Sequence, residues 1–227
     1  MADIKNHNLK NLYWVTFRDG NVRLATKNSD IGNKVYTERL VNQDGEEYRT
    51  FDPYKSKLGA AIFNKMQNFP FEENVKILYL GAASGTTVSH VSDIIGEQGS
   101  IYSVEFSARS LRDLVTVAER RKNILPIHAD ARFPEQYSMI VPQVDIVYED
   151  VAQPTQAEIL ETNVKTYLKD GGYFFLAVKS RSIDVTKDPQ VIFKEVVTKL
   201  ESGGLTVLET VDLEPYEKDH IMIVGKK

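Results

Sequence analysis

The feature that most limits what this chain can fold into is an apolar run that ends in a loop of small residues. Residues 76–80 (Lys-Ile-Leu-Tyr-Leu) run into 81–87 (Gly-Ala-Ala-Ser-Gly-Thr-Thr), and a second apolar run at 101–105 ends in Glu105. A helical pattern lies between the two runs, so the segment predicts a βαβ unit. Small residues let backbone N–H groups approach a ligand, and an acid about 20 residues beyond such a loop is placed to bind ribose hydroxyls. The segment therefore predicts a site for a nucleotide-like cofactor.

The spacing within the loop narrows the kind of cofactor. The loop reads Gly81-x-Ala83-x-Gly85, which is not a full Gly-x-Gly-x-x-Gly pattern. It also lacks the Gly-Lys-Ser/Thr sequence that cradles a triphosphate, which argues against a P-loop. Relaxed glycine loops of this kind resemble those of S-adenosylmethionine-dependent methyltransferases. The alternative is a glycine-rich turn between strand and helix that binds no ligand.

Strand and helix patterns alternate from residue 75 onward. Strand-like runs occupy 76–80, 100–105, 124–128, 144–149, 173–179, 205–212 and 220–225. Helical patterns fall near 86–95, 107–121, 134–140, 155–169 and 188–201. This alternation predicts an α/β fold with a doubly wound, Rossmann-like parallel sheet. The last two strands are joined by residues 214–219, too few for a crossover helix, so we expect an antiparallel pair. Seven strands with the last one reversed is the architecture of class I methyltransferases.

The first 53 residues have a different pattern. Asp-Gly pairs at 19–20 and 44–45 each separate two strand-like runs, which is typical of tight hairpins. The second hairpin would join 34–41 to 47–51. We therefore predict a small antiparallel β module at 1–53 and a methyltransferase domain at 54–227. A helix is also predicted at 55–68, where apolar residues recur at three- and four-residue spacing.

Composition argues against several classes of protein. The chain has no cysteine, and its four histidines lack metal-ligand spacing, so no metal site is expected. No apolar run reaches the roughly 20 residues that span a bilayer. Residues 1–5 lack the apolar core of a signal peptide, so we expect a cytoplasmic protein with no membrane partner. The net charge is −4, whereas a protein that grips nucleic acid alone usually has a basic excess. Either RNA is not a partner, or a partner protein supplies many of the contacts that bind the RNA.

Ligands of an open α/β sheet bind at the carboxyl ends of the strands. Glu105 suits a ribose, Phe106 an adenine face, and Asp130 an adenine amino group. Each has a plainer alternative, since Glu105 and Asp130 are also suited to capping a helix and a turn, and Phe106 to core packing. The full set of candidate cofactor-binding residues is Gly81, Ala83, Gly85, Thr86, Thr87, Glu105, Phe106, Asp130, Ala131, Asp150, Val151, Ala152 and Gln153.

Two charged residues end buried strands and suggest chemistry. Asp150 follows the run 144–149, and Lys179 closes the run 173–178. A buried strand ends in a charge either to reach solvent or to serve a site. Lys57 and His220 are less telling by themselves, because a lysine that starts a helix is commonly solvated and a lone histidine is commonly structural.

Six segments of the chain resemble the fibrillarin family, in particular its archaeal members. The segments are 54–61, 78–87, 89–93, 149–154, 177–187 and 213–220, which together extend from Tyr54 to His220. The resemblance implies a ribose 2′-O-methyltransferase that uses S-adenosyl-L-methionine to modify rRNA, with tRNA as a second target class, in a box C/D guide-RNA particle. It implies a Nop-family scaffold protein, a kink-turn-binding ribosomal-type protein, guide RNA and target RNA as partners. It also implies a catalytic set that corresponds here to Lys57, Asp150, Lys179 and His220.

Transfer of a methyl group to a 2′-hydroxyl requires alignment of the oxygen and removal of its proton. Lys179 is the candidate base, and a neighbouring positive Lys57 and partial burial would favour its neutral form. The sequence leaves open which of the two lysines takes the proton. Two rival functions remain, an NAD-dependent oxidoreductase and a non-catalytic subunit of an RNA particle.

Overall fold

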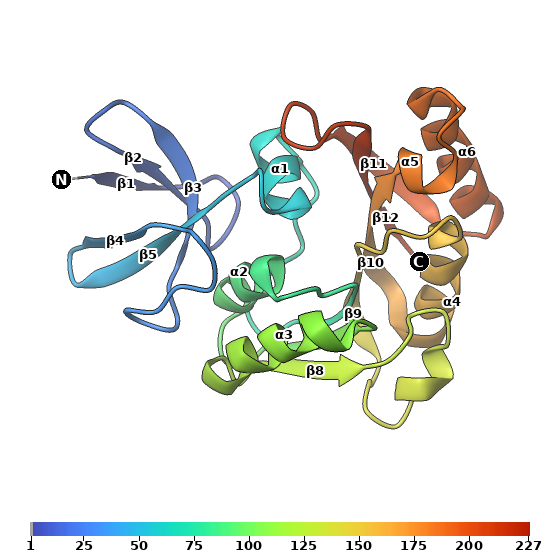
Figure 1. Ribbon diagram of the computed structural model, residues 1–227, viewed down its shortest axis with the longest axis horizontal. Helices are drawn as coiled ribbons and strands as arrows, with labels where there is room; N and C mark the ends of the chain where they lie inside the picture. The colour runs from blue at the N-terminus through green and yellow to red at the C-terminus, as the bar shows by residue number, and fades with distance from the viewer. Residues whose placement is uncertain (1) are drawn as a thin grey trace.

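The computed structural model describes residues 2–227, which form two β-sheets (Figure 1). The larger sheet has seven strands in the order β11-β12-β10-β9-β6-β7-β8. The strands are β6 (Lys76–Leu80), β7 (Ser100–Glu105), β8 (Ile124–His128), β9 (Val144–Glu149), β10 (Leu168–Lys179), β11 (Thr206–Asp212) and β12 (His220–Lys226). β12 runs antiparallel to both of its neighbours, and the other pairs are parallel. The predicted fold class is therefore confirmed, including the reversed last strand.

Helices cover both faces of this sheet (Figure 1). One face carries α1 (Lys57–Phe63), α2 (Thr86–Ile95) and α3 (Ala108–Arg120), and the other carries α4 (Gln156–Tyr167), α5 (Ser180–Ile183) and α6 (Pro189–Ser202). Successive side chains of a strand point to opposite faces, so each central strand contributes to two cores. On β9, Tyr148 packs in the first core and Val147 in the second. Burial on both faces explains why these strands are continuous apolar runs.

The predicted helix at 55–68 is wrong in its second half. α1 ends at Phe63, and Lys65 has a positive φ of 66°, which ends the helical path. The side chain of Asn64 donates to the carbonyls of Asp212 and Glu214. The backbone N–H groups of residues 67 and 68 donate to the carboxylate of Glu209. Residues 64–68 therefore bind the outer strand of the sheet instead of continuing the helix.

The predicted helix at 134–140 is also shorter than expected. Its residues form a 3₁₀ turn, η1 (Pro134–Tyr137). Pro142 restricts the residue before it to extended conformations, which disfavours an α-helix here. Within residues 2–227, no helix is both long and apolar enough to cross a membrane.

The N-terminal module is an antiparallel sheet in the order β1-β2-β3-β5-β4. Its strands are β1 (Asp3–Asn6), β2 (Tyr13–Thr16), β3 (Val22–Lys27), β4 (Leu40–Gln43) and β5 (Glu46–Phe51). Gly20 and Gly45 take positive φ angles of 80° and 83° in the two tight turns, as the Asp-Gly pairs predict. The strand predicted at 34–41 is wrong over 34–39, which is irregular. There the carboxylate of Glu38 accepts from the N–H groups of Val35 and Tyr36.

A buried cluster of charges joins this module to α2 and α3. Asp93 of α2 binds Arg49 of β5, with 3.1 Å between Oδ2 and Nε, and its Oδ1 also binds Arg121. Arg49 binds Glu38 at 3.2 Å. The side chains of these four residues are at most 1% exposed. Two carboxylates thus balance two guanidinium groups, and Asp93 binds both of them.

His90 lies beside this cluster and is neutral. Burial lowers the pKa of His90 well below its usual value, and the charges of Arg49 and Arg121 lower it further. Its Nδ1 is 2.8 Å from Thr26 Oγ1, and its Nε2 is 2.8 Å from the Tyr36 hydroxyl. A neutral imidazole has one donor and one acceptor nitrogen, so both hydroxyls are satisfied without a proton being added.

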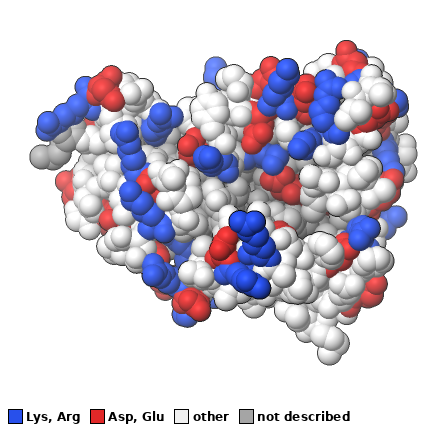
Figure 2. Space-filling view, viewed as in Figure 1, with Lys and Arg blue, Asp and Glu red and all other residues white. Residues whose placement is uncertain are grey.

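Lys and Arg side chains on the face drawn in Figure 2 are spread over the module and the larger domain. Acidic side chains lie among them, in keeping with the net charge of −4. This face therefore offers basic side chains in small groups and not as one continuous surface.

We expect Asp93→Asn to destabilise the protein by about 3–5 kcal/mol, because it leaves two buried guanidinium groups without their shared counter-charge. The measurement is the free energy of unfolding by chemical denaturation. The control is Asp113→Asn, an exposed position on α3, which should change stability by no more than about 0.5 kcal/mol. Equal effects of the two substitutions would contradict this role for Asp93.

Candidate active site

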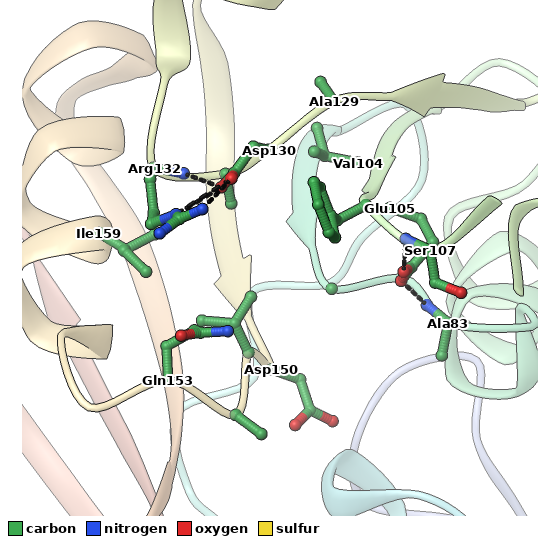
Figure 3. A pocket seen from close by; sticks show the side chains of 15 residues that line it. Ala83, Val104, Glu105, Ser107, Ala129, Asp130, Arg132, Asp150, Gln153 and Ile159 are labelled. Atoms are coloured by element: carbon green, nitrogen blue, oxygen red, sulfur yellow. Dashed lines mark hydrogen bonds and ion pairs between the residues drawn. The ribbon is translucent and has the colours of Figure 1, made fainter. Parts of the chain in front are cut away.

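A pocket of about 310 Å³ opens at the carboxyl ends of the central strands (Figure 3). Loops that follow β6, β7, β8 and β9 all contribute to it. Its lining residues are Gly81, Ala83, Val104, Glu105, Phe106, Ser107, Ala129, Asp130, Ala131, Arg132, Asp150, Val151, Ala152, Gln153 and Ile159. The pocket thus lies where the sequence pattern places a ligand.

The loops after β6 and β9 touch at the floor of this region. The backbone N–H of Asp150 donates to the carbonyl of Leu80 at 2.9 Å. Gly81 has a positive φ of 79°, and a Cβ built on it would lie 2.5 Å from the carbonyl oxygen of Asp150. A side chain at position 81 is therefore excluded both by the backbone conformation and by the space.

Glu105 binds the backbone of two loops on one side of the pocket (Figure 3). Its Oε2 accepts from the N–H of Ala83 at 2.8 Å, and its Oε1 accepts from the N–H of Ser107 at 2.7 Å. The N-cap of α3 is Ser107 itself, whose hydroxyl accepts from Ser110 N. Glu105 therefore shapes the glycine loop, and each of its oxygens keeps a further lone pair for a ligand hydroxyl.

Asp130 and Arg132 form a pair on the opposite wall (Figure 3). Arg132 Nε lies 3.1 and 3.0 Å from the two carboxylate oxygens of Asp130, and its Nη2 is 2.6 Å from Oδ2. The hydrogen bonds to Arg132 lower the pKa of Asp130. The backbone N–H of Arg132 also donates to Asp130, so the turn-capping alternative describes part of what this side chain does. Phe106 is 69% exposed, which argues against core packing.

Asp150 binds a lysine from outside the sheet. Lys57 Nζ lies 2.8 Å from Oδ1 and 3.0 Å from Oδ2 of Asp150, although the two residues are 93 positions apart in the sequence. The two side chains are 21% and 23% exposed, so the ion pair faces the open edge of the sheet. This ion pair holds Lys57 at the strand ends. The alternative, a lysine that is simply solvated, does not describe it.

Lys179 and His220 are adjacent across β10 and β12, where they are direct partners. The N–H and the hydroxyl of Ser180 both donate to the carbonyl of Asp219, which ties the two chain segments together just beyond this pair. His220 is 8% exposed, and its Nδ1 lies 2.6 Å from the carbonyl oxygen of Lys218. Lys179 is exposed, so the partial burial expected for it is not found.

The structure separates the predicted cofactor residues into two groups. Ten of the thirteen line the pocket, whereas Gly85, Thr86 and Thr87 do not. The hydroxyl of Thr87 donates to Ser56 Oγ at 2.9 Å, on the side of α1. Five lining residues were missed, namely Val104, Ser107, Ala129, Arg132 and Ile159. Arg132 could have been predicted from the sequence, because it lies two residues beyond Asp130. Ile159 could not, because it reaches the pocket from α4.

Glu149 is a buried acid that directly precedes Asp150. It is 0% exposed, and within residues 2–227 neither carboxyl oxygen has a hydrogen-bond partner. Burial raises the pKa of Glu149 well above its usual value, and the charges of Asp150 and Glu158 raise it further. Glu149 is therefore a neutral acid beneath the loop that contributes Asp150 to the site.

Comparison with known proteins places this geometry in a family context. A model of the fibrillarin family matches residues 4–227. The chain is similar to the fibrillarin-like rRNA/tRNA 2′-O-methyltransferase of Pyrococcus furiosus, with 54% identity over 227 residues and 100% coverage of both chains.

Two solved structures extend the comparison. Fibrillarin from Aeropyrum pernix, solved with natively bound S-adenosyl-L-methionine, is 48% identical, with a TM-score of 0.93 and 99% coverage of both chains. A chain of a fibrillarin/Nop5p complex is 38% identical, with a TM-score of 0.86, and the match covers 98% of this chain and 100% of that one.

We expect Glu149→Gln to make the protein more resistant to rising pH. The unfolded chain loses the Glu149 proton near pH 4.3, whereas the folded chain retains it to higher pH. Between these two pKa values the folded state binds more protons, so wild-type stability falls as pH rises, by up to about 1.4 kcal/mol per unit from this group. The variant removes this loss. Its stability relative to the wild type should therefore rise from pH 5 to pH 8 in denaturant titrations.

The matched control is Glu201→Gln, an exposed position on α6. Its stability relative to the wild type should be nearly constant over the same range. A pH-independent difference for Glu149→Gln would show that Glu149 is ionised in the folded protein.

Proposed function

This chain belongs to the fibrillarin family, and we propose that it transfers a methyl group from S-adenosyl-L-methionine to the ribose 2′-hydroxyl of RNA. The observation that carries the proposal is the position of the Lys57–Asp150 ion pair beside a pocket whose walls carry Glu105 and Asp130. The pocket has acceptors for a nucleoside, and the ion pair lies where a reacting hydroxyl would arrive.

The lining residues fit the cofactor. Glu105 offers carboxylate oxygens to two ribose hydroxyls, and Asp130 offers an acceptor to an adenine amino group. Exposed Phe106 offers a flat apolar face to the base. A volume of about 310 Å³ is at the small end for ligand pockets and favours a single nucleoside with a short tail over a dinucleotide. The guanidinium of Arg132 is engaged by Asp130, so it is not free for a pyrophosphate.

The cofactor, when bound, supplies a methyl group on a positively charged sulfur. The residues of the chain orient the 2′-hydroxyl and receive its proton. Lys57 is held by Asp150 as an ammonium group, so it is suited to stabilise negative charge that develops on the oxygen. Because Lys57 is engaged by Asp150, we take Lys179, at the end of the neighbouring strand β10, as the candidate to receive the proton. His220, beside Lys179 on the neighbouring strand, supports its position.

RNA recognition is best explained by delivery in a particle. The 2′-hydroxyl distinguishes RNA from DNA, but the basic side chains on this surface are interspersed with acidic ones (Figure 2). Few phosphate contacts give weak, salt-sensitive binding. We therefore infer that a Nop-family scaffold and a kink-turn-binding protein hold a box C/D guide RNA, and that guide pairing selects the target nucleotide in rRNA or tRNA.

We expect Glu105→Gln to weaken S-adenosyl-L-methionine binding by about 1–3 kcal/mol, because one acceptor oxygen is lost and the glycine loop loses a charged partner. This corresponds to roughly 5- to 150-fold in Kd. Calorimetry on the isolated chain measures it. Glu119→Gln, an exposed position on α3, should leave Kd unchanged. Unchanged affinity in Glu105→Gln would remove Glu105 from the cofactor site.

We expect Lys179→Ala to lower the single-turnover rate of methyl transfer by about 10²- to 10⁴-fold, the usual contribution of a positioned acid or base. The assay combines guide RNA, target RNA, both partner proteins and labelled cofactor, and maps the label to the 2′-oxygen. Lys194→Ala, an exposed lysine on α6, is the control. A label on the base would overturn the proposed function, and a wild-type rate in Lys179→Ala would overturn the role of Lys179.

A further inference from the structure

The wall of the pocket that carries Asp130 is an irregular loop between β8 and η1, the Asp130 loop (residues 129–133). Asp130, Ala131 and Arg132 of this loop line the pocket. The loop closes one turn, in which the N–H of Phe133 donates to the carbonyl of Asp130 at 3.0 Å. A surface loop is more mobile than the strands and helices around it unless other elements bind it. The contacts that hold this loop therefore decide where the carboxylate of Asp130 lies.

A buried asparagine of α4 binds this loop. The Nδ2 of Asn163 donates to the carbonyl of Ala131 at 2.9 Å and to the carbonyl of Ile159 at 2.9 Å. Its Oδ1 accepts from the hydroxyl of Tyr137, and both side chains belong to residues that are 0% exposed. A side-chain amide has two donor hydrogens and one acceptor oxygen, so both polar atoms of Asn163 have partners. The two carbonyls also fix which way round the amide lies.

Two tyrosines attach the chain beyond the Asp130 loop to the same helix. Tyr137 of η1 stacks on Tyr167 of α4, with 5.5 Å between the ring centroids. The hydroxyl of Tyr167 donates to the carbonyl of Pro134. η1 is thus held against α4, and the hydrogen bond from Asn163 extends this attachment into the Asp130 loop.

The attachment lies directly behind the pocket. Ala131, whose carbonyl Asn163 binds, is the neighbour of Asp130 in the sequence. Ile159 lies one turn before Asn163 and lines the pocket near Arg132 (Figure 3). A shift of the loop would leave a buried amide donor and a buried carbonyl without partners, which is unfavourable. The amide therefore favours one position of the loop over others.

We propose that Asn163 positions the Asp130 loop so that the pocket binds a purine with an amino group in preference to one with a keto oxygen. Asn163 is then a positioning residue, because it acts on the ligand through Ala131 and Asp130. A carboxylate accepts from an amino group but repels a keto oxygen at the same place, and a misplaced carboxylate does neither well. The base preference rests on the proposed function, whereas the effect of Asn163 on the loop itself does not.

Two variants remove the amide and differ in packing. Asn163→Leu fills the space and Asn163→Ala leaves it empty, so an effect seen in both comes from the lost hydrogen bonds. The same substitutions at Asn123 are the matched controls. Asn123 is 7% exposed, its Nδ2 donates to the carbonyls of Ser92 and Gly96 at 3.0 and 2.9 Å, and its Oδ1 accepts from Ser92 Oγ at 2.6 Å. Thermal melting verifies that each variant is folded at the assay temperature, and either Asn163 variant, if folded, decides the outcome.

The first readout is the base preference, measured by calorimetry on the full chain. The two ligands are S-adenosylhomocysteine, which is the cofactor without its methyl group, and S-inosylhomocysteine, which has a keto oxygen in place of the amino group. We expect the ratio of the inosyl Kd to the adenosyl Kd to fall by about fivefold or more in the Asn163 variants. In the Asn123 variants the ratio should stay within about twofold of the wild-type ratio. An equal loss of affinity for both ligands in the Asn163 variants would overturn the proposal, because a general loss of stability would produce it.

The second readout needs no ligand. Amide hydrogen exchange over residues 129–137, followed by mass spectrometry, should be faster by about threefold or more in the Asn163 variants and unchanged in the Asn123 variants. Unchanged exchange in a folded Asn163 variant would overturn the proposal. Faster exchange with a wild-type Kd ratio would also overturn it, because Asn163 would then hold the loop without setting the base preference. A wild-type chain that binds neither ligand would contradict the proposed function, and the exchange result would still decide whether Asn163 positions the loop.

Discussion

The site depends on one topological constraint: β6 and β9 are adjacent and parallel, but the chain leaves them toward opposite faces of the sheet. α2 follows β6 on one face and α4 follows β9 on the other (Figure 1), so the two loops diverge, and the pocket lies where they do. The loops meet at a close backbone contact, where Asp150 N donates to Leu80 O and Gly81 leaves room for Asp150 O. The cofactor loop and the residue that binds Lys57 are therefore positioned by the same contact.

Most of the larger sheet could be predicted because its strands are buried on both faces. The predicted strands at 76–80, 124–128 and 144–149 and the helix at 86–95 match the structure at both ends. The predictions failed where side chains far apart in the sequence decide the local structure. Residues 34–39 have a strand-like composition, but Glu38 is drawn to Arg49, and its carboxylate binds two N–H groups of its own segment, which prevents pairing with a strand.

The site could be predicted to the extent that it follows from strand ends. Glu105, Asp130 and Asp150 follow β-strand patterns, and each lines the pocket. The partner of Asp150 could not be found in this way, because Lys57 comes from a helix that precedes the sheet, and its assignment came from family resemblance. The direction of the Thr87 side chain also depends on where that helix packs, because its hydroxyl donates to Ser56, the N-cap of α1.

The buried and the half-buried acidic residues differ in their partners and in their access to solvent. Asp93 is inaccessible to solvent and binds two arginines. Removing one partner of a buried ion pair greatly destabilises a protein, so these contacts hold the N-terminal module firmly against α2. Asp150 and Lys57 retain more than a fifth of their exposure, so a substrate can reach them. Glu149 and Asp150 are neighbours in sequence, but the first lies in the core as a neutral acid and the second lies at the open edge as the partner of a lysine. Two adjacent carboxyl groups thus have different surroundings, because successive residues at the end of one strand point in opposite directions. This separation leaves one carboxylate at the strand end to hold Lys57, without a second charge competing for it.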